Sequence, residues 1–103
     1  MNTTLLFTRK YNKEVYSYYL NAPSYAGETG ILGIEITPYI SVVTPANCFG
    51  YTDTVLLNHY YDTDLKQTMF KAYTLNRYLA PWILKKIESK MIELTKKHIY
   101  PYK

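Results

Sequence analysis

The sequence has few of the residues that carry strong functional signatures. It contains a single cysteine, Cys48, in 103 residues, which excludes an internal disulfide, and no Cys/His spacing suggests structural zinc. The four glycines match neither dinucleotide-binding nor P-loop spacing, and there is no nucleophile elbow. The sequence therefore predicts no cofactor and no metal, and it favours a protein that is not an enzyme.

Long apolar segments are also missing. The longest, Ile31–Ile36 and Ala80–Leu84, are too short to span a bilayer. At the start of the chain, Leu5-Leu6-Phe7 precedes Arg9-Lys10, the reverse of the order in a secretion signal. We therefore expect a cytoplasmic protein without a membrane partner, located in the host cytoplasm if a phage encodes it.

Four residues have side chains that could take part in catalysis, and none stands in a recognisable motif: Glu35, Cys48, Asp53 and His59. A single free cysteine usually packs as a small hydrophobic residue, and a lone histidine among tyrosines is usually packed or hydrogen-bonded. The sequence predicts no catalytic residue.

The first sixty residues have the composition and alternation of β-strands, while 48% hydrophobic and 19% charged residues predict one folded domain, 1–103. Strands are expected over Thr4–Arg9, Glu14–Leu20, Ile31–Thr37, Tyr39–Thr44 and Tyr51–Asn58. A tight turn is expected at Tyr11-Asn12-Lys13, because asparagine tolerates left-handed backbone angles.

Residues 64–99 are expected to be helical, as one kinked helix or two separate ones. Asp64-Leu65-Lys66-Gln67 resembles a capping box, and Pro81 suits the first turn of a new helix. An apolar stripe follows at helical spacing through Leu84, Ile87, Met91 and Leu94. The fold class predicted is α+β: an antiparallel four- to five-stranded sheet with one or two C-terminal helices packed on one face.

Thirteen tyrosines are the strongest compositional signal. Tyrosine is enriched in binding surfaces, although an A+T-rich genome would also raise its frequency together with that of lysine. The first hypothesis is a small non-enzymatic factor of a phage or mobile element that binds and inhibits or redirects a host protein. Its predicted contact residues are Tyr16, Tyr18, Tyr19 and Tyr25.

Two alternatives follow from the net charge of +4. One is nucleic-acid binding through a lysine-rich C-terminal helix, with phosphate contacts from Lys85, Lys86, Lys90, Lys96 and Lys97. The other is capture of a nucleotide or cyclic oligonucleotide in a Tyr/Lys pocket, with the loops Asn21–Gly30 and Thr44–Gly50 as its rim. A homo-oligomer could accompany any of these functions.

Overall fold

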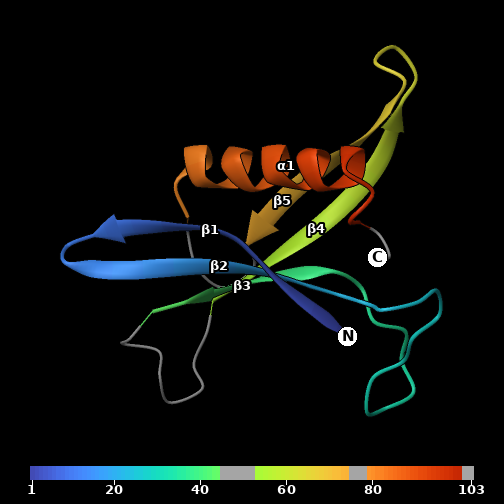
Figure 1. Ribbon diagram of the computed structural model, residues 1–103, viewed down its shortest axis with the longest axis horizontal. Helices are drawn as coiled ribbons and strands as arrows, with labels where there is room; N and C mark the ends of the chain where they lie inside the picture. The colour runs from blue at the N-terminus through green and yellow to red at the C-terminus, as the bar shows by residue number, and fades with distance from the viewer. Residues whose placement is uncertain (45–52, 75–78, 101–103) are drawn as a thin grey trace.

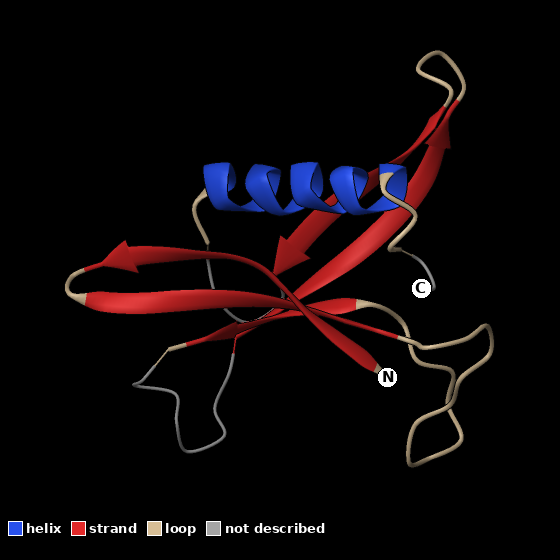
Figure 2. Ribbon diagram, viewed as in Figure 1, coloured by secondary structure: helices blue, strands red, loops and turns tan. Residues whose placement is uncertain are grey.

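The chain forms an antiparallel sheet followed by one helix. The computed structural model describes residues 1–44, 53–74 and 79–100 of the chain. Within these ranges the elements are β1 (Asn2–Tyr11), β2 (Glu14–Ala22), β3 (Tyr39–Val43), β4 (Asp53–Asp62), β5 (Gln67–Thr74) and α1 (Pro81–Lys96). The spatial order β1-β2-β3-β4-β5 follows the chain, and every neighbouring pair is antiparallel (Figures 1 and 2). The predicted α+β fold class is confirmed.

The β1–β2 hairpin closes through the turn that the sequence predicts. Asn12 and Lys13 both adopt positive φ angles, 48° and 66°. Two consecutive left-handed residues are typical of a type I′ turn, whose twist matches that of the flanking strands. The register then pairs Tyr11 with Glu14 and continues to Asn2 with Ala22, interrupted by a bulge between Leu5 and Phe7.

Helix α1 covers one face of the sheet. Pro81 occupies its first turn as expected, and Ile83, Ile87 and Met91 are buried. They pack on alternate residues of the strands: Tyr18, Leu20, Ala22, Ile40, Val42, Val55, Phe70 and Ala72. The stripe predicted from helical spacing is thus the face that completes the core.

The strand predicted over Ile31–Thr37 is wrong. Residues 23–38 form a long loop between β2 and β3, with only an isolated bridge between Thr29 and Glu35. A tight turn forms here because Gly33 adopts φ +72° and donates its N–H to the carbonyl of Gly30 at 3.1 Å. Of the apolar residues that alternate in this segment, Leu32 and Ile34 therefore lie in solvent, whereas Ile36 is half-buried.

The helix predicted to begin at Asp64 is also wrong. The segment is the β4–β5 hairpin, in which Asp62 Oδ1 accepts hydrogen bonds from the N–H groups of Asp64 and Leu65, each at 2.9 Å. An aspartate that holds a turn produces the same local sequence pattern as a helix cap. Cross-strand pairing of β5 with β4 then buries Phe70. The helical region therefore begins at Pro81, while residues 75–78 lie outside the described part.

Candidate functional site

The four tyrosines predicted as contact residues do not share one surface. Tyr18 was wrongly assigned to the surface: it is 0% exposed and stacks on Phe7 with ring centroids 4.4 Å apart. Its position follows from strand alternation, which turns Tyr16 and Tyr18 toward the helix side and Tyr19 toward the other face. Tyr16 and Tyr19 are half-buried, whereas Tyr25 is exposed in the loop 23–38.

A row of tyrosine and leucine side chains lies on the face of the sheet opposite α1. The register pairs Tyr39 with Leu56 and Leu56 with Tyr73, so these side chains form a row across β3, β4 and β5. Tyr39 and Tyr73 are half-buried, as is Tyr19 on the same face. Sequence analysis missed this row, because cross-strand register brings it together.

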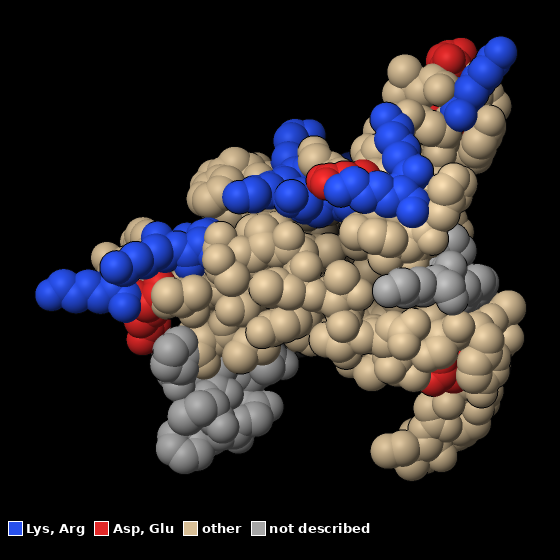
Figure 3. All heavy atoms as spheres, in the orientation of Figure 1, with Lys and Arg blue, Asp and Glu red and all other residues tan. Residues whose placement is uncertain are grey.

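Among the described residues, the three most exposed large apolar side chains lie in the loop 23–38. We call Tyr25, Ile31, Leu32 and Ile34 the apolar tip. Leu32 and Ile34 are 83% and 68% exposed, and Ile31 is fully exposed. The loop extends beyond the sheet on the side away from α1 (Figure 1) and forms a protrusion in the space-filling view (Figure 3). Such a cluster on a protruding segment is the usual mark of an interaction site.

Hydrogen bonds within the loop hold the tip in a defined conformation. Gly30 donates its N–H to the carbonyl of Ile34 at 2.9 Å, and Ile36 donates to Glu28 at 2.9 Å. Gly27, with φ +82°, provides a further backbone turn next to Tyr25. The tip is therefore a small ordered turn that presents its aliphatic residues.

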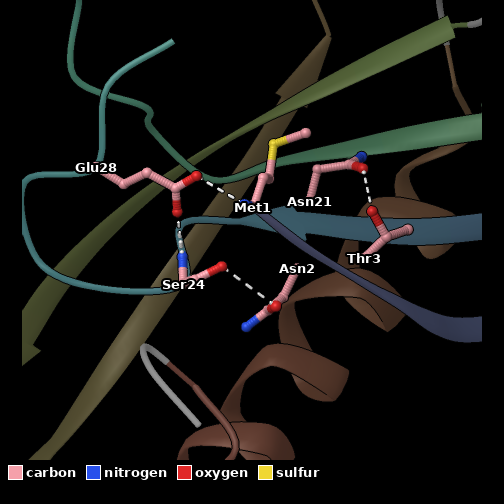
Figure 4. A network of polar contacts seen from close by, with 6 residues as sticks. All are labelled: Met1, Asn2, Thr3, Asn21, Ser24 and Glu28. Carbon is pink, nitrogen blue, oxygen red and sulfur yellow. Dashed lines mark hydrogen bonds and ion pairs between the residues drawn. The ribbon is translucent and has the colours of Figure 1, made fainter.

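The Glu28 carboxylate connects the loop 23–38 to the start of the chain, next to β1, through hydrogen bonds. Its two oxygens accept hydrogen bonds from the amino group of Met1 and from the backbone N–H of Ser24, each at 2.6 Å (Figure 4). The Ser24 hydroxyl also donates to Asn2 at 3.3 Å. The Met1 ammonium and the Ser24 N–H favour the ionised carboxylate and lower the pKa of Glu28.

Acidic and basic residues are unevenly distributed along the chain and over the surface. Residues 14–65 contain six acidic residues and no Lys or Arg, whereas residues 66–103 contain nine Lys or Arg and two Glu. In Figure 3, basic side chains gather over α1 and the two hairpin turns, and the protruding loop shows none. The apolar tip is thus flanked by acidic rather than basic side chains.

The five lysines predicted to contact phosphate lie on α1 or at its end, and three of them already have partners within the protein. Lys90 and Lys97 pair with Glu93 at 3.5 and 2.9 Å, and Lys86 lies 4.5 Å from the Phe7 ring centroid. The hydrogen bond from Lys97, and next the charge of Lys90, lower the pKa of Glu93. Lys85 and Lys96 are exposed.

One cleft in the described residues, with a volume of about 420 Å³, has no lysine or arginine in its lining. It is lined by Pro23, Glu35, Ile36, Thr37, Pro38, His59, Thr68, Thr95 and Tyr100. His59 is exposed at its margin. A second cleft of about 240 Å³ also lacks lysine and arginine. These clefts give no support to a Tyr/Lys pocket for a phosphate-bearing ligand, because they offer phosphate no such cation.

The structure also bears on metal binding and on membrane-spanning helices. In residues 1–44, 53–74 and 79–100, no three His, Cys, Asp or Glu side chains gather where they could hold a metal ion. No helix in the same ranges has the length and apolar character needed to cross a membrane. Cys48 and most of the predicted loop Thr44–Gly50 lie outside the described residues.

Comparison with other proteins gives no family assignment: no protein-family model, curated protein or solved structure matches this chain.

Proposed function

We propose that this protein is a binding module that inserts its apolar tip into an apolar pocket of a partner protein. The observation that supports the proposal is the exposure of Ile31, Leu32 and Ile34 together on one turn. Transferring an aliphatic side chain of this size from water into an apolar site contributes about 1.5–3 kcal/mol. Burial of three such side chains would favour association by about 4.5–9 kcal/mol before the entropic cost of association is subtracted.

The order of the loop supports the same function. Association costs less free energy when the binding segment already has its bound conformation. The hydrogen bond between Gly30 and Ile34, and the attachment of Glu28 to Met1 and Ser24, restrict the tip before any partner arrives. The tip therefore resembles an anchor that needs little ordering on binding.

The surroundings of the tip indicate the chemistry of the partner. Glu35 is exposed beside the tip, and no Lys or Arg occurs between residues 14 and 65. A pocket with apolar walls and a basic rim fits this surface, because opposite charges at the rim favour association. That the partner is a host protein, and that the chain is a phage or mobile-element factor that inhibits or redirects it, stays a prediction.

The test compares two exposed apolar positions in the tip with one exposed apolar position elsewhere. The tagged protein is incubated with nuclease-treated lysate of cells in which it acts, beside the variants Ile31→Ser/Leu32→Ser and Leu65→Ser. Leu65 is 58% exposed on the β4–β5 hairpin, so Leu65→Ser controls for the loss of exposed apolar surface outside the tip. We expect one stoichiometric partner with the native protein and with Leu65→Ser, and its loss with the double variant. Equal recovery of that partner by all three proteins would refute the proposal.

A further inference from the structure

Arg9 is held in a cage of aromatic rings between the β1–β2 hairpin and the start of α1. Its guanidinium carbon lies 4.7 Å from the centroid of Tyr16, 5.4 Å from that of Tyr11 and 5.7 Å from that of Trp82. Its Nε donates a hydrogen bond to the hydroxyl of Tyr18 at 2.8 Å. We call these five residues the Arg9 cluster. The register explains part of it, because Arg9 lies directly opposite Tyr16.

The guanidinium keeps most of its hydrogen-bonding capacity. An arginine has five N–H donors, and within the described residues only the Nε of Arg9 has an acceptor. No carboxylate in this part of the chain forms an ion pair with Arg9. The rings fix the position of the guanidinium without neutralising its charge. Its planar fork is therefore oriented in advance for an anion.

An accessible ring and further cations adjoin the guanidinium. Trp82 is 56% exposed although it belongs to the first turn of α1. Lys85 and Lys86 follow it at i+3 and i+4, so they lie next to the indole on the helix surface. The site therefore combines an exposed indole, on which a planar ring can stack, with the positive charges of one guanidinium and two lysines.

We propose that the Arg9 cluster binds a nucleotide, with its phosphate on the Arg9 guanidinium and its base stacked on Trp82. Guanidinium matches the geometry of phosphate oxygens, and indole offers an apolar plane to any base. An acidic peptide would use the charge but not the ring. The site is separate from the apolar tip: Figure 1 shows α1 beginning on the side of the molecule where the β1–β2 turn lies, while the loop 23–38 lies on the other side.

Trp82 is the sole tryptophan, so its own fluorescence reports on the site. AMP, a single-stranded oligothymidylate, inorganic phosphate and polyglutamate are titrated separately against the native protein. We expect saturable quenching by AMP, by the oligothymidylate or by both, together with weaker binding of phosphate and polyglutamate. Quenching by AMP identifies a free nucleotide as sufficient, and quenching by the oligothymidylate alone identifies a nucleotide unit within a strand. Both results support the proposal.

Variants then assign the contacts. Arg9→Lys keeps the charge but loses the planar fork, and we expect it to weaken binding about tenfold or more, the loss typical of a charge-assisted hydrogen bond. Lys71→Gln removes an exposed charge on β5 and should leave affinity unchanged, so it is the matched control for Lys85→Gln. Trp82→Leu is followed through the anisotropy of a labelled oligothymidylate or AMP, with an expected loss of about tenfold from lost stacking.

Circular dichroism checks that Arg9→Lys remains folded, and Lys85→Gln on the exposed helix surface removes one positive charge next to Trp82. Absence of quenching by both nucleotide probes would overturn the proposal. Polyglutamate binding as tightly as the nucleotides would overturn it in favour of an acidic peptide. The proposal would also be overturned if three folded variants all bound the nucleotide probes as tightly as the native chain does: Arg9→Lys, Lys85→Gln and Trp82→Leu. None of these results bears on the apolar tip.

Discussion

Glu88 of α1 accepts a hydrogen bond from the backbone N–H of Ala72 in β5 at 2.9 Å. Because β5 is the last strand of the sheet, this N–H points away from β4 and would otherwise lack a strand partner. Unpaired strand edges promote association with other chains, and a helix packed over the edge prevents it. The helix thus completes the core and also protects one edge of the sheet.

Replacing Glu88 should therefore destabilise the fold. The change Glu88→Ala leaves the Ala72 N–H without its acceptor, and an unsatisfied buried donor costs about 1–3 kcal/mol. Urea unfolding measures the loss, and light scattering should show an increased tendency to self-associate. Glu93→Ala, which removes an exposed carboxylate from the same helix, is the control and should change stability much less. Equal effects of the two variants would contradict this account of the sheet edge.

Two isoleucines should respond very differently to truncation. Ile87 is 0% exposed in the core, and Ile87→Ala should cost about 2–5 kcal/mol because it leaves a cavity. Ile31 is fully exposed in the apolar tip, and Ile31→Ala should change stability by less than about 0.5 kcal/mol. Chemical denaturation of both variants measures the contrast. A large loss for Ile31→Ala would indicate that the tip packs against the protein and is not presented to solvent.

The β1–β2 turn should become more stable with glycine at its second position. Lys13 adopts φ 66°, a conformation that is strained for a residue with a side chain. Lys13→Gly creates Asn-Gly, the preferred pair for a type I′ turn, and should stabilise the protein by about 0.4–1 kcal/mol. Thermal unfolding gives the result, with Lys10→Gly in the strand as a destabilising control. A decrease in stability for Lys13→Gly would show that the lysine side chain has a role that the turn geometry does not explain.

Acid should weaken the attachment of the loop to β1. The pKa of Glu28 is lower in the folded state than in the unfolded chain. At pH values near these two pKa values, the unfolded chain therefore binds more protons than the folded protein does. The stabilisation is complete above the unfolded pKa of about 4.3 and is lost as pH falls through the folded pKa. The difference in stability between the native protein and Glu28→Gln should therefore be largest near neutral pH and shrink in acid. Glu93 has the same direction of shift and contributes in the same range. A difference for Glu28→Gln that does not change with pH would contradict the role of the Met1–Glu28 pair.

The sequence correctly predicted a turn and a helix, because each depends mainly on residues that are close together in the chain. Asn12-Lys13 indicated a turn, and Pro81 with the stripe through Ile87 and Met91 indicated the helix and its buried face. The same kind of signal failed at Asp64, because an aspartate that starts a helix and one that closes a hairpin turn precede similar residues. In that segment, pairing with β4 decided the structure, and this pairing depends on residues distant in the sequence.

The candidate sites were harder to predict for the same reason. The alternation of Leu32, Ile34 and Ile36 is that of a half-buried strand. Within the described residues, however, this segment forms only an isolated bridge and no strand, and two of these three side chains are exposed. Tyr18 looked like a surface residue until the register placed it beneath α1. Arg9 and Trp82 are brought together only when α1 packs beside the β1–β2 hairpin. No spacing in the sequence could have indicated that contact.

The most direct test of the proposed function is site-specific photocrosslinking from position 32. A photoreactive amino acid replaces Leu32 in one protein and Leu65 in another, and both are irradiated in the cells where the protein acts. The proposal predicts a single abundant crosslinked partner from position 32, lost when Ile31→Ser is added, and no such product from position 65. Absence of a product from position 32, or the same partner captured equally from both positions, would contradict it.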